Sequence, residues 1–107
     1  MIKITRERLP SGGVRIEMTG HAESKRNENG HDLVCAAASC LAYTLADAAR
    51  ECCQRPEICL EPGLTVIKGT PKLDRRTEYT TAMEYIARGF DLLQNSYPDC
   101  LEVSDWR

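Results

Sequence analysis

Two pairs of short strand-like segments, each joined by a tight turn and each followed by a helical repeat, constrain the fold of this chain most strongly. Residues 2–6 and 14–18 alternate on either side of a Pro-Ser-Gly-Gly turn, which is the pattern of a β-hairpin. Residues 58–61 and 64–68 flank a Pro-Gly turn and predict a second hairpin. A short final strand is expected at residues 101–104.

The two helical repeats follow the two hairpins. In the first, Asp32 is a favoured N-cap, because its carboxylate accepts hydrogen bonds from the free amides of the first turn. Apolar residues then recur at helical spacing to about residue 53, namely Val34, Ala37, Ala38, Leu41, Leu45, Ala48 and Cys52. The second repeat begins after Asp74 and ends before Pro98. Gly89 inside it costs roughly 1 kcal/mol relative to alanine, which indicates close packing on a neighbouring element.

The resulting order of elements is β-β-α-β-β-α-β. Strands do not alternate singly with helices in this order, which excludes a simple parallel sheet of the Rossmann type. The order predicts an α+β fold in which two helices pack on one mixed or mostly antiparallel sheet. The chain has 107 residues, so we expect residues 1–107 to form one domain with its own core.

The charge and hydropathy of the sequence argue against nucleic acids and membranes as partners of this chain. The formal net charge is -2 and basic residues gather only in short pairs, such as Lys25-Arg26, so no direct contact with nucleic acid is expected. The sequence contains no apolar run of about 18 residues or more, which a membrane span would need. Its first ten residues lack the apolar core of a secretory signal. The sequence therefore predicts a cytoplasmic protein without a membrane partner.

Six cysteines raise the question of disulfides and metals. A reducing cytoplasm disfavours disulfides. The sequence has no Cys-x-x-Cys pair, and its two histidines lie far from any second pair of ligands, so we expect neither a metal site nor another cofactor. Cys40, Cys52 and Cys53 fall within the first apolar helical repeat, and we interpret them as small buried hydrophobes.

Cys35 differs from the other five thiols because it lies three residues past the predicted N-cap. Free amides and the positive end of the helix dipole stabilise a thiolate in a first turn. The same amides, at Cys35 and Ala36, are suited to hold a developing oxyanion. His21 follows Gly20 at the end of the second predicted strand. It is a candidate general base if that strand adjoins the start of the helix.

Each candidate also has an ordinary structural interpretation. A cysteine that opens an apolar helix is usually part of the core, and a histidine at a strand end is usually structural or exposed. His31, four residues before Cys35, is a rival base. Ser39, one turn beyond Cys35, either bonds the backbone carbonyl four residues back or orients the thiol or a substrate group. Asp32 caps the helix and is also placed to orient an imidazole.

The chain contains Gly20-His21-Ala22, then a polar loop, then Gly-His-Asp-Leu-Val-Cys-Ala-Ala-Ala-Ser at residues 30–39. This arrangement resembles the signature of the ribosomal-processing cysteine protease family, which reads G-H-A, a variable loop, and G-x-D-[IL]-V-C-A-A-x-S. The match is specific because it combines two motifs at the right separation. Length and element order extend the resemblance loosely to the whole chain.

The resemblance implies a small bacterial cysteine endopeptidase, a homodimer without a cofactor. Its expected substrate is a large-subunit ribosomal protein precursor, from which it removes the N-terminal extension. His21 and Cys35 match the catalytic dyad of the family, and Gly20, Asp32 and Ser39 match the other signature positions. Residues 23–30 match a mobile loop that gates the site in the family. The chain departs from the family in the high charge of this loop and in a second thiol, Cys40, after the signature serine.

Two other interpretations remain open. In a non-catalytic, ribosome-associated interaction module, Cys35 would belong to the core and the polar loop would be a docking surface. In a redox or metal-binding protein, the clustered cysteines would carry the function.

Overall fold

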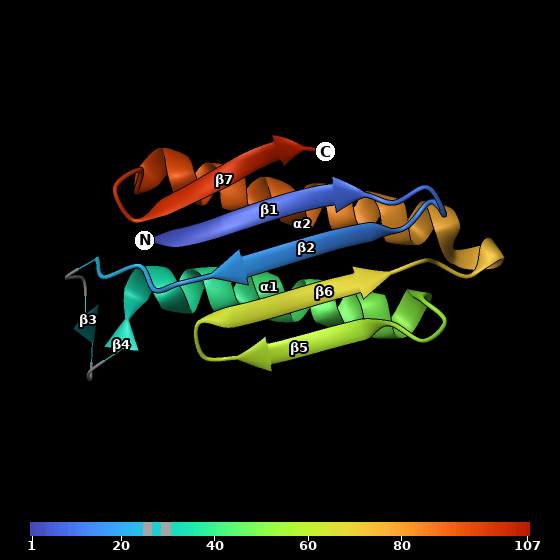
Figure 1. The fold of residues 1–107 in the computed structure, drawn as a ribbon, viewed down its shortest axis with the longest axis horizontal. Helices are drawn as coiled ribbons and strands as arrows, with labels where there is room; N and C mark the ends of the chain where they lie inside the picture. The colour runs from blue at the N-terminus through green and yellow to red at the C-terminus, as the bar shows by residue number, and fades with distance from the viewer. Residues whose placement is uncertain (25–26, 29–30) are drawn as a thin grey trace.

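The computed structural model describes residues 1–24, 27–28 and 31–107, with the backbone alone at 27–28 and 31. Its main element is a five-stranded mixed sheet of order β5-β6-β2-β1-β7 (Figure 1). The antiparallel strands are β1 (Ile2–Arg8), β2 (Val14–Thr19), β5 (Glu57–Glu61) and β6 (Leu64–Gly69). The fifth strand, β7 (Leu101–Trp106), pairs parallel with β1. The predicted α+β class and element order are confirmed.

Two helices lie side by side behind the sheet in Figure 1 and cover one of its faces. They are α1 (Leu33–Cys52), which contacts β6, and α2 (Arg76–Ser96), which contacts β7 and follows a 3-10 turn at Leu73–Arg75. A Cβ placed on Gly89 of α2 would lie 2.6 Å from Cδ2 of Leu41 on α1. The predicted close packing at Gly89 is therefore confirmed, and its neighbour is the other helix.

The core lies between the sheet and the two helices. Its largest fully buried side chains come from both layers: Ile2, Ile4, Ile16, Ile67 and Leu101 from strands, and Val34, Leu45, Tyr79, Met83 and Phe90 from helices. The buried stripe of α1 includes Ala42, Ala46 and Ala49, whereas the predicted Ala37, Leu41 and Ala48 are only partly buried. The prediction was right for Ala38 but chose Ala37 and Ala48 wrongly, because the alanines of this helix are equally apolar in sequence.

The cysteines of α1 do not share one environment. Cys52 and Cys53, at the end of the helix, are buried as predicted, and burial raises the pKa of both thiols. The same prediction is wrong for Cys40, which is exposed on the outer face of α1. All six cysteines lie in the described part of the chain, and each is a free thiol.

Within the described residues, α1 is the one helix long and apolar enough to cross a membrane by length and composition. Its buried stripe packs against the sheet and α2 in this fold. That position is typical of the central helix of a globular domain.

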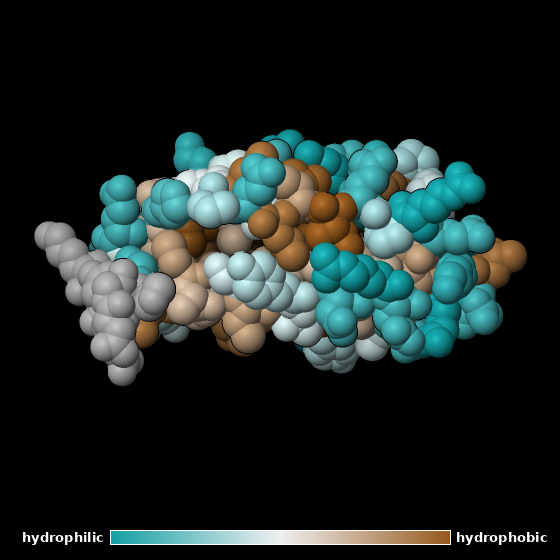
Figure 2. Space-filling view, turned by 90° about the horizontal axis from the view of Figure 1, so that it is seen from below, coloured by the Kyte–Doolittle hydropathy of each residue, from teal (hydrophilic) through white to brown (hydrophobic). Residues whose placement is uncertain are grey.

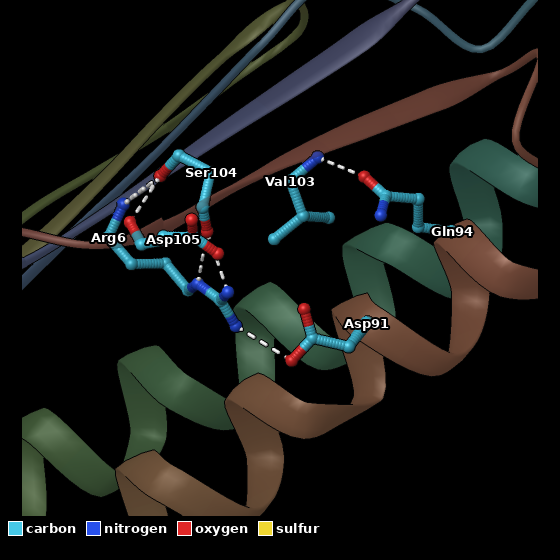
Figure 3. Close-up of polar contacts among 6 residues, drawn as sticks. All are labelled: Arg6, Asp91, Gln94, Val103, Ser104 and Asp105. Atoms are coloured by element: carbon cyan, nitrogen blue, oxygen red, sulfur yellow. Dashed lines mark hydrogen bonds and ion pairs between the residues drawn. The ribbon is translucent and has the colours of Figure 1, made fainter.

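Arg6 is the one buried charged side chain among the described residues, and it shares the inner face of β1 with Ile2 and Ile4. Its Nε and Nη2 donate to the carbonyl oxygen of Ser104 at 3.0 and 2.6 Å, and its Nη1 donates to Oδ2 of Asp91 at 2.9 Å (Figure 3). The register of β1 against β7 shifts at this point. Arg6 therefore ties β1 to both β7 and α2, at a distance from the cavity described next.

Candidate active site

A cavity of about 220 Å³ lies where the end of β2, the turn between β5 and β6, and the first turns of α1 meet. Both predicted reactive residues line it, Cys35 from α1 and His21 from the segment after β2. Gly20 and Ser39 also line the cavity. The remaining walls are formed by Ile2, Met18, Tyr43, Leu60, Glu61, Pro62, Gly63, Leu64 and Thr65.

Asp32 builds the start of α1. Its Oδ1 accepts hydrogen bonds from the N–H groups of Val34 at 2.8 Å and Cys35 at 3.0 Å, which confirms the predicted N-cap. Its Oδ2 accepts from the N–H of Ser24 at 2.7 Å. Burial alone would raise the pKa of Asp32, but these hydrogen bonds outweigh it and hold that pKa below its ordinary value. One carboxylate thus ties the helix start to the segment that leaves β2.

Replacement of Asp32 should therefore destabilise the fold in a pH-dependent way. We expect Asp32→Ala to lower the free energy of unfolding by about 0.5–2 kcal/mol at pH 7, the usual cost of losing an N-cap. The folded pKa of Asp32 is depressed, so its contribution is complete above the ordinary carboxyl value of about 3.9 and is lost as pH falls through the folded value. Urea unfolding followed by circular dichroism at several pH values measures this difference.

The exposed Asp99 provides the matched control for this experiment. Asp99→Ala should change the free energy of unfolding by less than about 0.5 kcal/mol at every pH. A deficit of Asp32→Ala that stays constant from neutral to strongly acid pH would show that the carboxylate does not act as described.

The sulfur of Cys35 has a backbone donor. Its Sγ accepts a hydrogen bond from the N–H of Ala22, with 3.2 Å between nitrogen and sulfur, and Ala22 itself is buried. Because Ala22 directly follows His21, one segment carries the candidate base and also holds the sulfur. The hydrogen bond therefore fixes the sulfur against the segment that carries His21. Sequence reasoning assigned Ala22 no role, although it stands in the Gly-His-Ala motif, because the direction of a backbone amide is not visible in sequence.

The backbone amides at the start of α1 are not free, in contrast to the prediction. The N–H of Cys35 is already bonded to Asp32. Ala36 is the first residue whose N–H bonds within the helix itself, and Ala36 is exposed. The structure therefore does not support the prediction that the amides of Cys35 and Ala36 are free to hold an oxyanion.

His21 lies at the exposed rim of the cavity, against the turn between β5 and β6. A Cβ placed on Gly63 of this turn would be 3.2 Å from Nε2 of the imidazole. Gly20 adopts a positive φ of 86°, and its N–H donates to the carbonyl of Gly63 at 3.0 Å. Among the described residues the imidazole has no hydrogen-bond partner, Cys35 included. Cys35 and His21 share this cavity without a hydrogen bond between them, and hydrogen bonds between catalytic groups are often unformed in unliganded sites.

Ser39 lies on the cavity side of α1, one turn beyond Cys35. Its hydroxyl makes no bond to the carbonyl four residues back within the described structure, whereas Thr44 bonds the carbonyl of Cys40 in this way at 2.7 Å. The hydroxyl of Ser39 is therefore available to a group that enters the cavity.

The polar stretch after His21 is only partly described. Its backbone forms two short strands, β3 (Asn27–Glu28) and β4 (His31–Asp32), paired antiparallel, where the sequence predicted a loop alone. Residues 25–26 and 29–30, and the side chain of His31, lie outside the described residues. The gating role of this stretch and the rival role of His31 as base therefore stay predictions.

The chemistry open to this cavity is that of a thiol beside an imidazole. In the described part of the chain, no group of three His, Cys, Asp or Glu side chains is placed to hold a metal ion. Of the described residues that line the cavity, Glu61 is the single one with a carboxylate. The arrangement suits nucleophilic attack by sulfur, with proton transfer through His21.

Comparison with known proteins gives a family match over most of the chain. The family model described as "Cysteine protease Prp" matches residues 1–102. No curated protein sequence matches the chain.

Three solved structures share this fold. Two are of the essential ribosomal processing protease Prp from S. aureus, each at 22% identity and with 100% of both chains covered. The TM-score is 0.76 for the complex with a covalently linked product peptide and 0.73 for the complex with a substrate peptide. The third is SMU.848 from Streptococcus mutans, at 24% identity, with 100% of this chain and 96% of that chain covered and a TM-score of 0.71. At these identities the likeness shows a common fold.

Proposed function

The chain belongs to the cysteine protease Prp family, and from this premise we propose that Cys35 is the nucleophile of an endopeptidase and His21 its general base. One observation carries the assignment: Cys35 and His21 line the same cavity, and the residue after His21 donates its N–H to Sγ of Cys35. No other cysteine lines this cavity, although all six lie in the described residues. The remaining thiols are therefore set apart from the imidazole.

The proposed reaction is acyl transfer to sulfur followed by hydrolysis. His21 takes the proton of the Cys35 thiol, the thiolate attacks the scissile carbonyl carbon, the carbonyl π bond opens, and a tetrahedral intermediate forms. His21 gives a proton to the leaving amine, the C–N bond breaks, and a thioester remains on Cys35. His21 then takes a proton from water, which attacks the thioester and releases the acid product. For these steps the imidazole must approach Sγ to hydrogen-bond reach.

The neighbouring residues take supporting roles in this proposal. Asp32 fixes the first turn of α1 and the chain at Ser24, and Gly20 provides the turn that precedes His21. Ser39 is free to bond the substrate. The N–H of Ala22 donates to Sγ, so in this proposal it holds the attacking sulfur in place.

The proposed substrate is the precursor of a large-subunit ribosomal protein, from which the enzyme removes the N-terminal extension. In this proposal the enzyme acts in the cytoplasm and is a homodimer. Family membership and the likeness to a ribosomal processing protease solved with peptides support this substrate. β5 is the outer strand that contributes to the cavity, through Leu60 and Glu61, so an extended peptide can add to its free edge. Figure 2 looks at the molecule from the β5 side and shows apolar surface gathered in the middle of this face.

Incubation with the ribosomal-protein precursor encoded in the same genome tests the proposed endopeptidase function. After incubation with the enzyme, mass spectrometry should find one shortened form of the ribosomal protein, with a single new N-terminus. The mature protein, which lacks the extension, should keep its mass under the same conditions. An uncleaved precursor, or a scatter of cuts in both proteins, would reject the proposed substrate.

A further inference from the structure

We propose that Gly63, in the turn between β5 and β6, is a positioning residue for His21. The turn forms a seat against which the imidazole rests, and only a residue without a side chain leaves room for the ring. This inference rests on the proposed role of His21 as general base. It adds to the dyad a residue that lies outside the two sequence motifs.

The contact between the turn and the ring is close. A Cβ placed on Gly63 would lie 3.2 Å from Nε2 and 3.7 Å from Cε1 of His21. The first distance is shorter than an ordinary van der Waals contact, and the ring would have to shift by some tenths of an ångström to accept a methyl group there. Nε2 is one of the two ring nitrogens that can carry a proton to and from Cys35.

The backbone of the same turn also holds the residue before His21. The carbonyl of Gly63 accepts the N–H of Gly20 at 3.0 Å. Gly63 therefore affects His21 in two ways. Its carbonyl holds the backbone that precedes His21, and its lack of a side chain leaves space for the imidazole ring.

No polar side chain among the described residues orients the imidazole of His21. Among the described residues the imidazole of His21 has no hydrogen-bond partner, whereas many catalytic histidines are oriented by a third polar group. Packing on the turn is thus the restraint that the structure offers to this ring. Since misplacement by about 1 Å can cost on the order of 100-fold in rate, a smaller shift should still be measurable.

The positive φ of Gly63, 78°, gives a second reason for glycine at this position, and the test must separate the two. Gly12, in the turn between β1 and β2, provides the matched control. It has a similar φ of 86°, but a Cβ there would meet only the guanidinium of Arg76, at 3.8 Å or more. Gly12→Ala and Gly63→Ala therefore impose similar backbone strain, and only the second disturbs His21.

We expect Gly63→Ala to lower kcat for precursor cleavage about tenfold, with KM changed less than about twofold. Gly12→Ala should lower Tm to a similar extent and leave kcat near the wild-type value. The effect should also vanish without the imidazole: in a His21→Ala background, Gly63→Ala should change the residual single-turnover rate by less than about twofold. Gly63→Asn and Gly12→Asn repeat the comparison with a residue that tolerates positive φ, should the alanine variants fail to fold.

Equal losses of kcat in the two glycine variants, or an undiminished loss in the His21→Ala background, would overturn the inference. Its failure is distinct from failure of the proposed function. If cleavage requires Cys35 and His21 but Gly63→Ala and Gly63→Asn keep full kcat, only the seat is wrong. If cleavage does not require His21, the proposed function is wrong first.

Discussion

Cys35→Ala is expected to abolish cleavage of the precursor while the fold is retained. The substitution removes the sulfur that forms the thioester, and no other thiol lines the cavity within the described residues. Loss of a catalytic nucleophile costs on the order of 10⁴-fold in kcat or more. The side chain of Cys35 is only partly buried, so far-ultraviolet circular dichroism and cooperative thermal unfolding should be preserved. Mass spectrometry of the precursor gives the readout.

Cys40→Ala is the matched control for this variant. Cys40 belongs to the same helix and is more exposed than Cys35, but it lies on the outer face of α1 and outside the cavity. This variant should cleave the precursor at nearly the wild-type rate. Cleavage by a folded Cys35→Ala variant at a rate close to wild type would exclude Cys35 as nucleophile.

His21→Ala is expected to lower kcat by about 10²–10⁴-fold, the usual contribution of a general base and acid. The loss should appear in kcat because the imidazole transfers protons in the chemical steps, and the His21 side chain is exposed, so the fold should not depend on it. Steady-state cleavage of the precursor measures this effect.

The variant His31→Ala tests the rival base in the same experiment, by comparison with His21→Ala. We expect nearly wild-type kcat for this variant, because the sulfur of Cys35 accepts the N–H of Ala22, the residue that directly follows His21. A larger loss in His31→Ala than in His21→Ala would transfer the role of base to His31.

The order of elements could be predicted from sequence because its signals are local. Alternation along residues 2–6 and 14–18, the turn at Pro62-Gly63 and the cap at Asp32 each act within a few residues of the chain. The parallel pairing of β7 with β1 and the placement of both helices on one face could not be derived, because they follow from contacts between distant segments. The burial predicted for Cys40 was wrong for another reason: it rested on residue type alone, although Cys40 lies off the apolar stripe of the helix.

Some features of the candidate site could likewise be predicted from local sequence, and others could not. The place of Cys35 in a capped first turn could be inferred from nearby residues, whereas its pairing with His21 rested on the resemblance of two motifs to a family. The cavity now brings both residues together. The donation from Ala22 to sulfur and the seat at Gly63 depend on backbone direction and on a turn from the second hairpin, which no short pattern encodes.

The relative alkylation rates of the six thiols test the central claim, the activation of Cys35, most directly. The folded protein is treated briefly with iodoacetamide at neutral pH, and peptide mass spectrometry follows each cysteine. Exposure alone would make Cys40 react faster than the half-buried Cys35. If Cys35 is the activated nucleophile of the proposed dyad, with its sulfur held by the N–H of Ala22, this residue should react first by a wide margin. A rate at Cys35 no higher than at Cys40 would contradict the account.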